Sequence, residues 1–300
     1  MNTNLFNKVK SIIEVNKFNY DKILKKSAIK LVDSGEFDIN VIIGCRGRSE
    51  FVVPVIESFE KAIKASGKKI TITIVEHNKF PEHMKPCRDR VNYIWTKGNV
   101  EEQYSRSFTY NFGVKYANNS KLYLLHDLDI LVKENFFEEL YQNLGDKTCL
   151  QPYGGRRVLY MSNELTKKVI SKEIDYNQFN EKSEEVSLPQ FIGSKGGSIL
   201  IAKELFEEVG GFDPEIFWGY AHEDQFFWDK VMTIGEIAYA DNPHIDMFHM
   251  WHPPSHATNP QHREMESVWS AFKSLSDKEK KEIINLKKEI YLKDETNIKK

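Results

Sequence analysis

The sequence has few cysteines and no long apolar segment. Its three cysteines, Cys45, Cys87 and Cys149, are an odd number without the spacing of a metal site, which argues against a disulfide framework and against structural zinc. No apolar run approaches the roughly 20 residues that a membrane helix requires, and the first residues lack the apolar core of a secretory signal. These absences exclude a transmembrane protein, and we expect a reducing, cytoplasmic location.

An excess of charge of either sign is also missing. The chain of 300 residues has 42 Lys and Arg against 44 Asp and Glu, a formal net charge of -2. Without a broad basic field, nucleic acid is not an expected partner, and an anionic ligand must be met by a local site. Hydrophobic residues make up 40% and charged residues 29%, the balance of a globular protein with a sizeable core.

Two common phosphate-binding loops are absent. The segment Gly44-Cys45-Arg46-Gly47-Arg48-Ser49 matches neither a Walker loop nor a dinucleotide Gly-x-Gly-x-x-Gly, which argues against ATP hydrolysis and hydride transfer. Arg46 and Arg48 at the end of a predicted strand suit a nucleotide diphosphate held by forked hydrogen bonds, and Arg106 could join them. The alternative is that these arginines only cover the surface.

Predicted strands alternate with predicted helices along the middle of the chain. Apolar β-rich runs at 38–43, 69–75, 122–125 and 196–201 alternate with helical patterns at 50–65, 104–117, 203–209 and 218–231. This order predicts an α/β fold with a mainly parallel sheet flanked by helices. We divide the chain into a helical N-terminal extension (1–36), an α/β domain (37–265) and a C-terminal helical tail (266–300). Residues 151–190 are expected to be irregular, and the tail a surface helix that frays.

Two carboxylates directly follow the predicted strand at 122–125. Asp127 and Asp129 flank Leu128, and ligands of parallel α/β sheets bind beyond the carboxyl ends of the strands. The alternate spacing directs both carboxylates to one side, where they could hold a divalent ion and its diphosphate. A solvated turn is the alternative reading of this short motif.

A second acidic pair lies in an aromatic and glycine-rich setting. In Trp218-Gly219-Tyr220-Ala221-His222-Glu223-Asp224 the two carboxylates begin a predicted helix, whose N-terminus favours their anionic forms and could keep a general base available. Trp218 and Tyr220 suit stacking on a sugar. The alternatives are an acidic first helical turn and two core rings.

Four histidines occur within fourteen residues, at positions 249, 252, 256 and 262. Imidazole suits manganese alongside carboxylate oxygens, so one of these histidines with Asp129 and a diphosphate would make an open octahedral site. Cysteines are missing near this run and no His-Glu-x-x-His helix is present, which argues against zinc protease chemistry. A satisfied core histidine is the alternative for any single one.

In this order, the motifs resemble those of the β-1,4-galactosyltransferase family and its bacterial relatives, which have the GT-A fold. The second aspartate of Asp127-Leu128-Asp129 stands where the family's Asp-Val-Asp ligates manganese. Several further segments also look like family motifs, namely residues 41–50, 104–113, 196–198, 211–212, 217–224 and 259–261. The resemblance covers about residues 37–265.

The resemblance implies a metal-dependent, inverting transfer of a hexose or N-acetylhexosamine, with galactose or N-acetylgalactosamine favoured, from a UDP-sugar to a glycan hydroxyl. Mn²⁺, or Mg²⁺ in its place, is the implied cofactor. The implied base is Asp224, with Glu223 orienting the acceptor. The other implied site residues are the donor-binding Arg46, Arg48, Arg106, Asp127, Gly196 and Gly197, the sugar-binding Trp218, Tyr220 and Ser194, and the metal ligands Asp129 and His252, with His249 in reserve.

The sequence departs from the family pattern at informative positions. Ser194 replaces a tyrosine that crowds the sugar 2-position in galactose users, so an N-acetylhexosamine donor could fit. Ala221-His222 replaces a Gly-Gly pair beside the base, and the spacing of the metal histidine is one residue short.

Other functions remain open. One is a retaining or polymerising hexosaminyltransferase of the same fold, and another is a non-catalytic nucleotide-sugar or glycan binding module. A sugar nucleotidyltransferase would need a Gly-x-Gly-x-Arg start that is absent. The acceptor could be a glycan or a lipid-linked saccharide. The lysine-rich terminal helices are solvated faces or dock on the inner face of a membrane.

Overall fold

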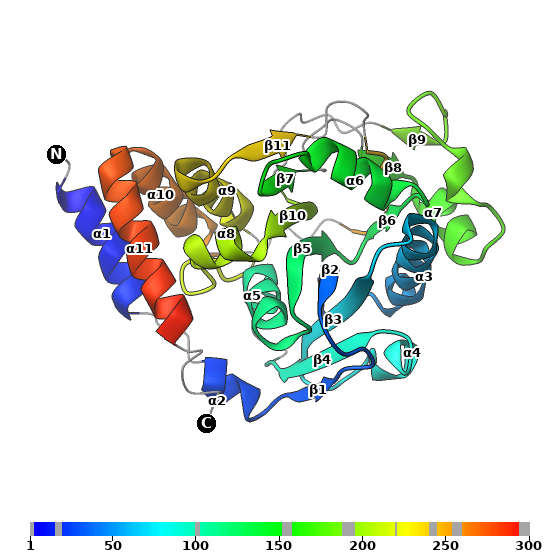
Figure 1. Cartoon of the computed structure of the whole chain (residues 1–300), viewed down its shortest axis with the longest axis horizontal. Coiled ribbons are helices and arrows are strands. Elements are labelled where there is room, and N and C mark those ends of the chain that lie inside the picture. Colours follow the sequence, from blue (N-terminus) through cyan, green and yellow to red (C-terminus); the bar gives the residue numbers. More distant parts are fainter. Residues whose placement is uncertain are drawn as a thin grey trace.

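An eight-stranded sheet forms the centre of the fold (Figure 1). The computed structural model describes residues 3–15, 20–99, 103–151, 158–187, 196–219, 221–239, 245–253 and 260–293. The strands lie in the order β1 (Ala28–Lys30), β4 (Asn92–Lys97), β3 (Ile70–Asn78), β2 (Phe37–Cys45), β5 (Ser120–Asp127), β10 (Ser198–Ala202), β7 (Cys149–Gln151) and β11 (Ile237–Tyr239). All but β1 and β10 run in one direction, which confirms the mainly parallel sheet.

A smaller sheet continues from the end of β5. Its order is β6 (Ile130–Val132), β12 (Met247–His249), β8 (Val158–Met161) and β9 (Val186–Ser187). Only Leu128 and Asp129 separate β5 from β6. The Asp127–Asp129 motif therefore lies at the junction of the two sheets, and β12 brings its own C-terminal residues to the same place.

Alternating residues of β2 supply the cores on both faces of the large sheet. Val41 and Ile43 pack with α3 (Ser49–Ser66) and α6 (Phe136–Leu144), whereas Ile42 packs on the other face with α5 (Arg106–Tyr116), α8 (Lys203–Glu208) and α9 (Glu223–Ile234). This arrangement follows from the two-residue period of a strand, with each fully buried aliphatic side chain contributing about 1.5–3 kcal/mol. A continuous apolar strand is therefore covered by helices on both sides.

Three helices from the two ends of the chain pack together at one side of the molecule (Figure 1). They are α1 (Thr3–Val15), α10 (His262–Lys273) and α11 (Asp277–Lys293). Ile283 and Ile284 of α11 are buried against α1 and α10. The predicted tail helix is present up to Lys293, and its apolar face completes a core with α1 and α10. Residues 294–300, where fraying was expected, lie outside the described residues.

Two other segments differ from the expectation. Residues 158–187 are not an irregular excursion, since they hold β8, β9, the helix α7 (Asn163–Ile170) and the 3-10 turn η2 (Tyr176–Gln178). The Ser162 hydroxyl caps α7 by accepting from Leu165 N at 3.1 Å. In the N-terminal segment α1 and α2 (Tyr20–Leu24) are helical, but residues 28–30 form the edge strand β1. The strand β4 and the short helix α4 (Met84–Cys87) were not predicted.

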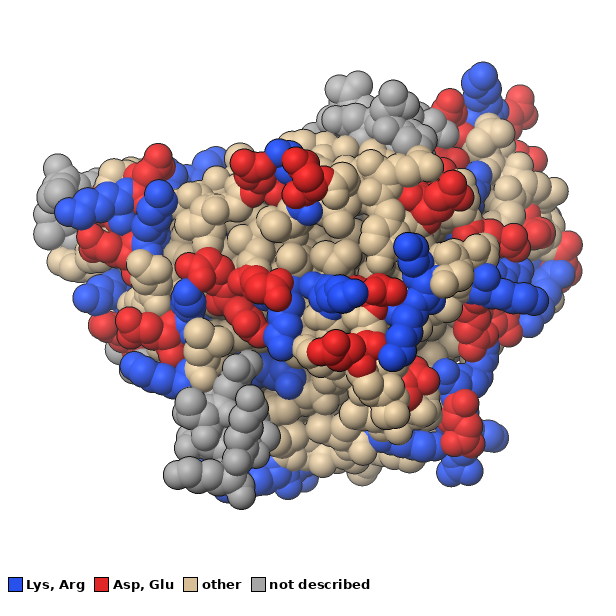
Figure 2. All heavy atoms as spheres, in the orientation of Figure 1, with Lys and Arg blue, Asp and Glu red and all other residues tan. Residues whose placement is uncertain are grey.

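Charges of both signs are interspersed over the face of the molecule seen in Figure 2, as the nearly balanced composition leads one to expect. Among the described helices, none is both long and apolar enough to cross a membrane.

Candidate active site

The carboxyl end of β5 carries the first carboxylate of the site. Asp127 accepts hydrogen bonds from Arg106 Nη1 and from Tyr110 Oη, both at 2.8 Å. Its backbone N–H donates to Gly197 O at 2.8 Å. Burial raises the pKa of Asp127, and Arg106 opposes that rise. Asp127 thus connects the end of β5 to α5 and to Gly197.

Asp129 lies among two histidines and an arginine. His252 Nε2 is 3.1 Å from Asp129 Oδ2, His249 Nε2 is 3.8 Å from Oδ1, and Arg48 donates to Oδ2. One ligand atom from each of Asp129, His249 and His252 falls within 4.8 Å of the others. Burial alone would raise the pKa of Asp129, but the two histidines and Arg48 hold it below its ordinary value. The site keeps a buried carboxylate ionised, as a metal ligand must be.

The two histidines differ in environment. His249, on β12, stacks on Tyr160 with ring centroids 4.6 Å apart, and its buried Nδ1 has no hydrogen-bond partner among the described residues. Burial lowers the pKa of His249, whereas the hydrogen bond to Asp129 raises the pKa of His252. Both predicted metal histidines therefore reach Asp129, from the end of β12 and from the segment after it.

The loop that follows β2 carries the predicted nucleotide-binding arginines. Arg48, at φ 54° in the left-handed region, precedes α3, and its Nη2 lies 3.2 Å from His252 Nδ1. Arg46 donates to Asn99 O instead. Beneath the loop, buried His83 contacts Gly47 O through Nε2 at 3.0 Å. The two arginines of this loop thus have different partners: Arg46 contacts Asn99, and Arg48 contacts Asp129 and His252.

Arg106 joins the two acidic clusters that the sequence separates by about a hundred residues. It begins α5 after the Ser105 cap, and its Nη2 contacts Glu223 Oε1 at 2.9 Å and Asp224 Oδ2 at 3.0 Å, while Nη1 binds Asp127. Burial raises the pKa of Glu223 to about 7 despite Arg106. Both members of the predicted catalytic pair lie at the first turn of α9, beside the carboxyl end of β5.

Gly196 leaves no room for a side chain. A Cβ there would come within 2.2 Å of Asp224 Oδ2 and 2.9 Å of Arg106 Nη1. The neighbouring Gly197 has φ 84°, a conformation that side-chain-bearing residues rarely adopt. The glycine pair therefore lets the backbone approach the Asp224 carboxylate closely.

The aromatic part of the prediction is only partly described. Trp218 is half-buried and packs edge-on against His77, with ring centroids 5.8 Å apart, and against Phe108. Tyr220 and Ser194 lie outside the described residues, and so does His256. His262 lies on α10 beside His222 rather than at Asp129.

Sequence reasoning missed two residues that shape the site. Tyr110 follows Arg106 by four positions, so both lie on one face of α5 and reach Asp127. That spacing was a usable signal. His83 has no such signal, because its contact with Gly47 depends on how α4 packs under the loop.

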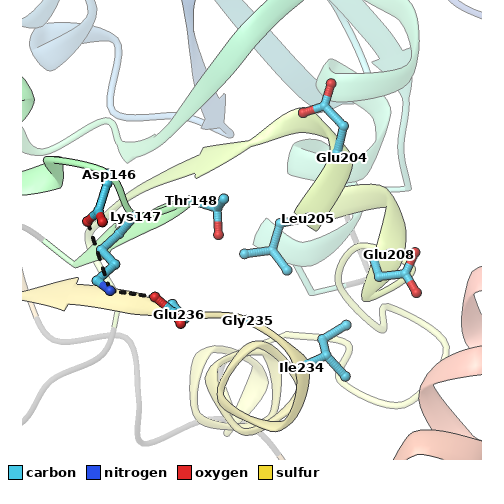
Figure 3. A pocket seen from close by; sticks show the side chains of 9 residues that line it. All are labelled: Asp146, Lys147, Thr148, Glu204, Leu205, Glu208, Ile234, Gly235 and Glu236. Atoms are coloured by element: carbon cyan, nitrogen blue, oxygen red, sulfur yellow. Dashed lines mark hydrogen bonds and ion pairs between the residues drawn. The ribbon is translucent and has the colours of Figure 1, made fainter.

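Figure 3 shows a pocket of about 390 Å³. It is lined by Thr148 before β7, by residues of α8, and by Ile234 and Gly235 at the C-terminal end of α9, whereas Glu223 and Asp224 begin that helix. Because this 12-residue helix is about 18 Å long, the pocket and the two carboxylates lie at opposite ends of it. No predicted site residue lines this pocket, so it is not the candidate active site.

Comparisons with known proteins identify the fold. No protein-family model and no curated protein matches the sequence. Among solved structures, the chain is similar to the catalytic domain of Drosophila β1,4-galactosyltransferase 7 in complex with xylobiose, with TM-score 0.52 and 16% identity over 78% of this chain and 79% of that one. It is also similar to residues 1–349 of S. aureus TarS with UDP-GlcNAc, with TM-score 0.53 and 11% identity over 82% and 70%.

A mannosyltransferase from Pyrobaculum calidifontis with GDP-Man and Mn²⁺ is similar over more of the chain. Its TM-score is 0.52 and its identity 12%, over 97% of this chain and 81% of that one. At such identities the likeness concerns the fold. The chain has the GT-A fold of the glycosyltransferases.

Proposed function

We propose that this protein is a metal-dependent inverting glycosyltransferase, which moves a hexose or N-acetylhexosamine from a UDP-sugar to a glycan hydroxyl. One observation carries the proposal. Arg106 bridges Asp127, at the end of β5, to Glu223 and Asp224, at the start of α9, beside the Asp129, His249 and His252 cluster. A donor site and a base thus share one strand end, where open α/β sheets bind ligands.

The Asp129 cluster fits a manganese ion. It offers a carboxylate and two imidazoles, a donor set that suits Mn²⁺ or Mg²⁺ once diphosphate oxygens complete the coordination. The buried Nδ1 of His249 has no hydrogen-bond partner among the described residues, and Asp129 is held ionised. When bound, the metal would offset the charge that develops on the departing diphosphate.

The donor is held on the β5 side of the site. Arg48 exchanges its contact with Asp129 for the diphosphate, Arg46 binds the nucleotide, and Asp127 supports it as the first carboxylate of an Asp-x-Asp motif. Gly196 and Gly197 bring backbone close to the sugar. Ser194 replaces the tyrosine that crowds the sugar 2-position in the family's galactose users, which favours N-acetylgalactosamine beside galactose as the donor sugar.

The acceptor is held on the α9 side. Asp224 takes the proton from the attacking hydroxyl, and Glu223 orients that hydroxyl, while Trp218 and Tyr220 flank the sugars. Arg106 keeps both carboxylates in place through contacts of 2.9 and 3.0 Å. In-line displacement places the base on the face opposite the diphosphate, which inverts the anomeric carbon.

The structural neighbours support the reaction class. Their structures contain UDP-GlcNAc, xylobiose, or GDP-Man with Mn²⁺, which are nucleotide sugars and a saccharide. We infer a glycan or lipid-linked saccharide acceptor for this chain, in polysaccharide biosynthesis. A lipid-linked acceptor would bring the lysine-rich helices to the inner face of a membrane.

Donor hydrolysis tests the proposal. UDP release is measured from UDP-galactose, UDP-N-acetylgalactosamine, UDP-glucose and UDP-N-acetylglucosamine, with Mn²⁺ or EDTA, for the wild type, Asp129→Ala and Asp224→Asn. We expect one donor to turn over only with Mn²⁺, and at least a hundredfold loss in each variant. Release that is unchanged in Asp129→Ala would contradict the metal assignment. An α-linked product from an α-linked donor, seen by NMR, would favour a retaining enzyme instead.

Binding without turnover is the remaining alternative. If UDP binds by calorimetry but none of these four donors is hydrolysed, even with mixed saccharide acceptors present, the chain is a binding module or uses a different donor.

A further inference from the structure

A second cluster of metal-ligating side chains lies between α9 and α10. His222 directly precedes α9, and His262 and Glu266 occupy the first turns of α10. One ligand atom from each lies within 4.8 Å of the other two. In the described part of the chain these three residues form a cluster separate from Asp129, His249 and His252, so the second cluster is distinct from the proposed Mn²⁺ site.

The histidine at the centre of this cluster is poorly satisfied by the protein. Its ring stacks on Trp269, with centroids 4.7 Å apart and planes at 16°, and lies 4.9 Å from the His262 ring. Stacking fixes the plane of the ring but satisfies neither nitrogen. Both Nδ1 and Nε2 of His222 are buried and have no partner at good hydrogen-bond geometry in the described part of the chain, where the Gln225 side chain is a weak partner. Unpaired buried polar atoms are costly, and most have a partner that explains them.

The protonation state and the donor set both suit a transition metal. Burial and the neighbouring His262 lower the pKa of His222, which keeps the imidazole neutral and able to coordinate. Two imidazoles and a carboxylate form a three-ligand set found in zinc sites, with metal–ligand distances of about 2.1 Å. The Glu266 side chain is exposed and can rotate toward the histidines to close the set.

We propose that His222, His262 and Glu266 bind a divalent transition metal, Zn²⁺ in preference to Mn²⁺. Without a diphosphate to add oxygen ligands, the nitrogen-rich set favours zinc over manganese in the usual affinity order. The bound ion would tie α10 to His222, the residue before Glu223 and Asp224. Because it joins two helices of the folded chain, its expected effect is on stability.

Zinc titration in a background without the first cluster tests the proposal. The Asp129→Ala, His249→Ala variant removes two of the three ligands there. In this background we expect calorimetry to show one Zn²⁺ per chain and a rise of the melting temperature by several degrees, because the metal binds only the folded state. Added His262→Gln or Glu266→Gln should each weaken Zn²⁺ binding at least tenfold, with the larger loss for His262→Gln.

Glu264→Gln is the matched control, because Glu264 is an exposed carboxylate on the same first turn of α10. It should leave Zn²⁺ binding unchanged, and all variants should melt like their background in EDTA. Absence of stoichiometric zinc binding in that background would overturn the proposal. So would binding that survives both His262→Gln and Glu266→Gln unchanged, since the zinc would then be held by other histidines.

Discussion

Glu223 is buried, and its ionisation should therefore affect how the stability of the protein depends on pH. Burial raises its pKa from 4.5 to about 7, so the folded protein holds this proton more tightly than the unfolded chain does. Its contribution to stability is therefore full below about pH 4.5 and is lost as the pH rises through 7. The raised pKa corresponds to about 3 kcal/mol of unfolding free energy at most.

Glu223→Gln should remove this pH dependence. We expect urea unfolding at pH 5, 6 and 7 to show a smaller decline of the unfolding free energy with pH in the variant than in the wild type. Glu264→Gln, at an exposed position, should keep the wild-type slope. Parallel slopes in wild type and Glu223→Gln would show that Glu223 titrates at its ordinary pKa.

Gly196 offers a second test at the residue scale. Gly196→Ala places a methyl group within 2.2 Å of Asp224 Oδ2, so the carboxylate must move away from its place beside Arg106. We expect kcat for sugar transfer to fall at least tenfold while the melting temperature changes little, because the displaced atom ends a side chain. Small displacements of a catalytic group cost this much or more.

Gly67→Ala is the control for Gly196→Ala. A Cβ at Gly67 meets nothing within 4 Å, but its φ of 62° is strained for alanine. This variant should lose about 1 kcal/mol of stability and keep full activity. Equal activity of Gly196→Ala and wild type would mean that Asp224 is not the base or does not need its observed position.

A buried ion-pair network connects the C-terminal helix α11 to the rest of the molecule. Lys287 pairs with Glu215, and Lys230 of α9 contacts Asp213 at 2.5 Å; these four side chains are at most 4% exposed. The next residue, Lys288, pairs with Glu208 at the surface, with 34% and 47% of the two side chains exposed. Of these two adjacent lysines, Lys287 thus forms a buried ion pair and Lys288 an exposed one.

Lys287→Met and Lys288→Met should therefore differ sharply. Loss of Lys287 leaves buried carboxylates uncompensated and should lower the unfolding free energy by about 3–5 kcal/mol, whereas an exposed pair contributes less than about 1 kcal/mol. Chemical denaturation of both variants measures the difference. Similar small losses would mean that α11 is a peripheral helix, contrary to its packing against α1 and α10.

For the whole molecule, the proposed metal site connects two sheets. Asp129 follows β5 of the large sheet, and His249 ends β12 of the small one. Mn²⁺ with UDP should raise the melting temperature by a few degrees, because a ligand at 100 times its Kd adds about 2.7 kcal/mol to the folded state. UDP with EDTA should give a much smaller rise, and His249→Ala should lose most of the Mn²⁺ effect. A rise independent of His249 would remove it from the ligand set.

The sequence alone determined the strands and helices whose side chains follow a regular period, and the acidic pair that follows a strand. The isoleucine-rich run of β2, the helical spacing of α3 and α5, and the Asp127–Asp129 pair after a strand are set by side-chain alternation and by the strand-to-ligand geometry of α/β sheets. These features were sufficient to predict a mainly parallel sheet, and they identified both acidic motifs before any long-range contact was known.

Only the tertiary structure decided which of these motifs meet. Arg106 lies 117 residues from Glu223, and nothing in their local sequences encodes that ion pair. The same holds for His262, which joins His222 and not Asp129, and for α11, whose isoleucines cover α1 and α10. Such contacts depend on how distant elements pack, because a helix or strand pattern states which face is apolar but not which surface will cover it.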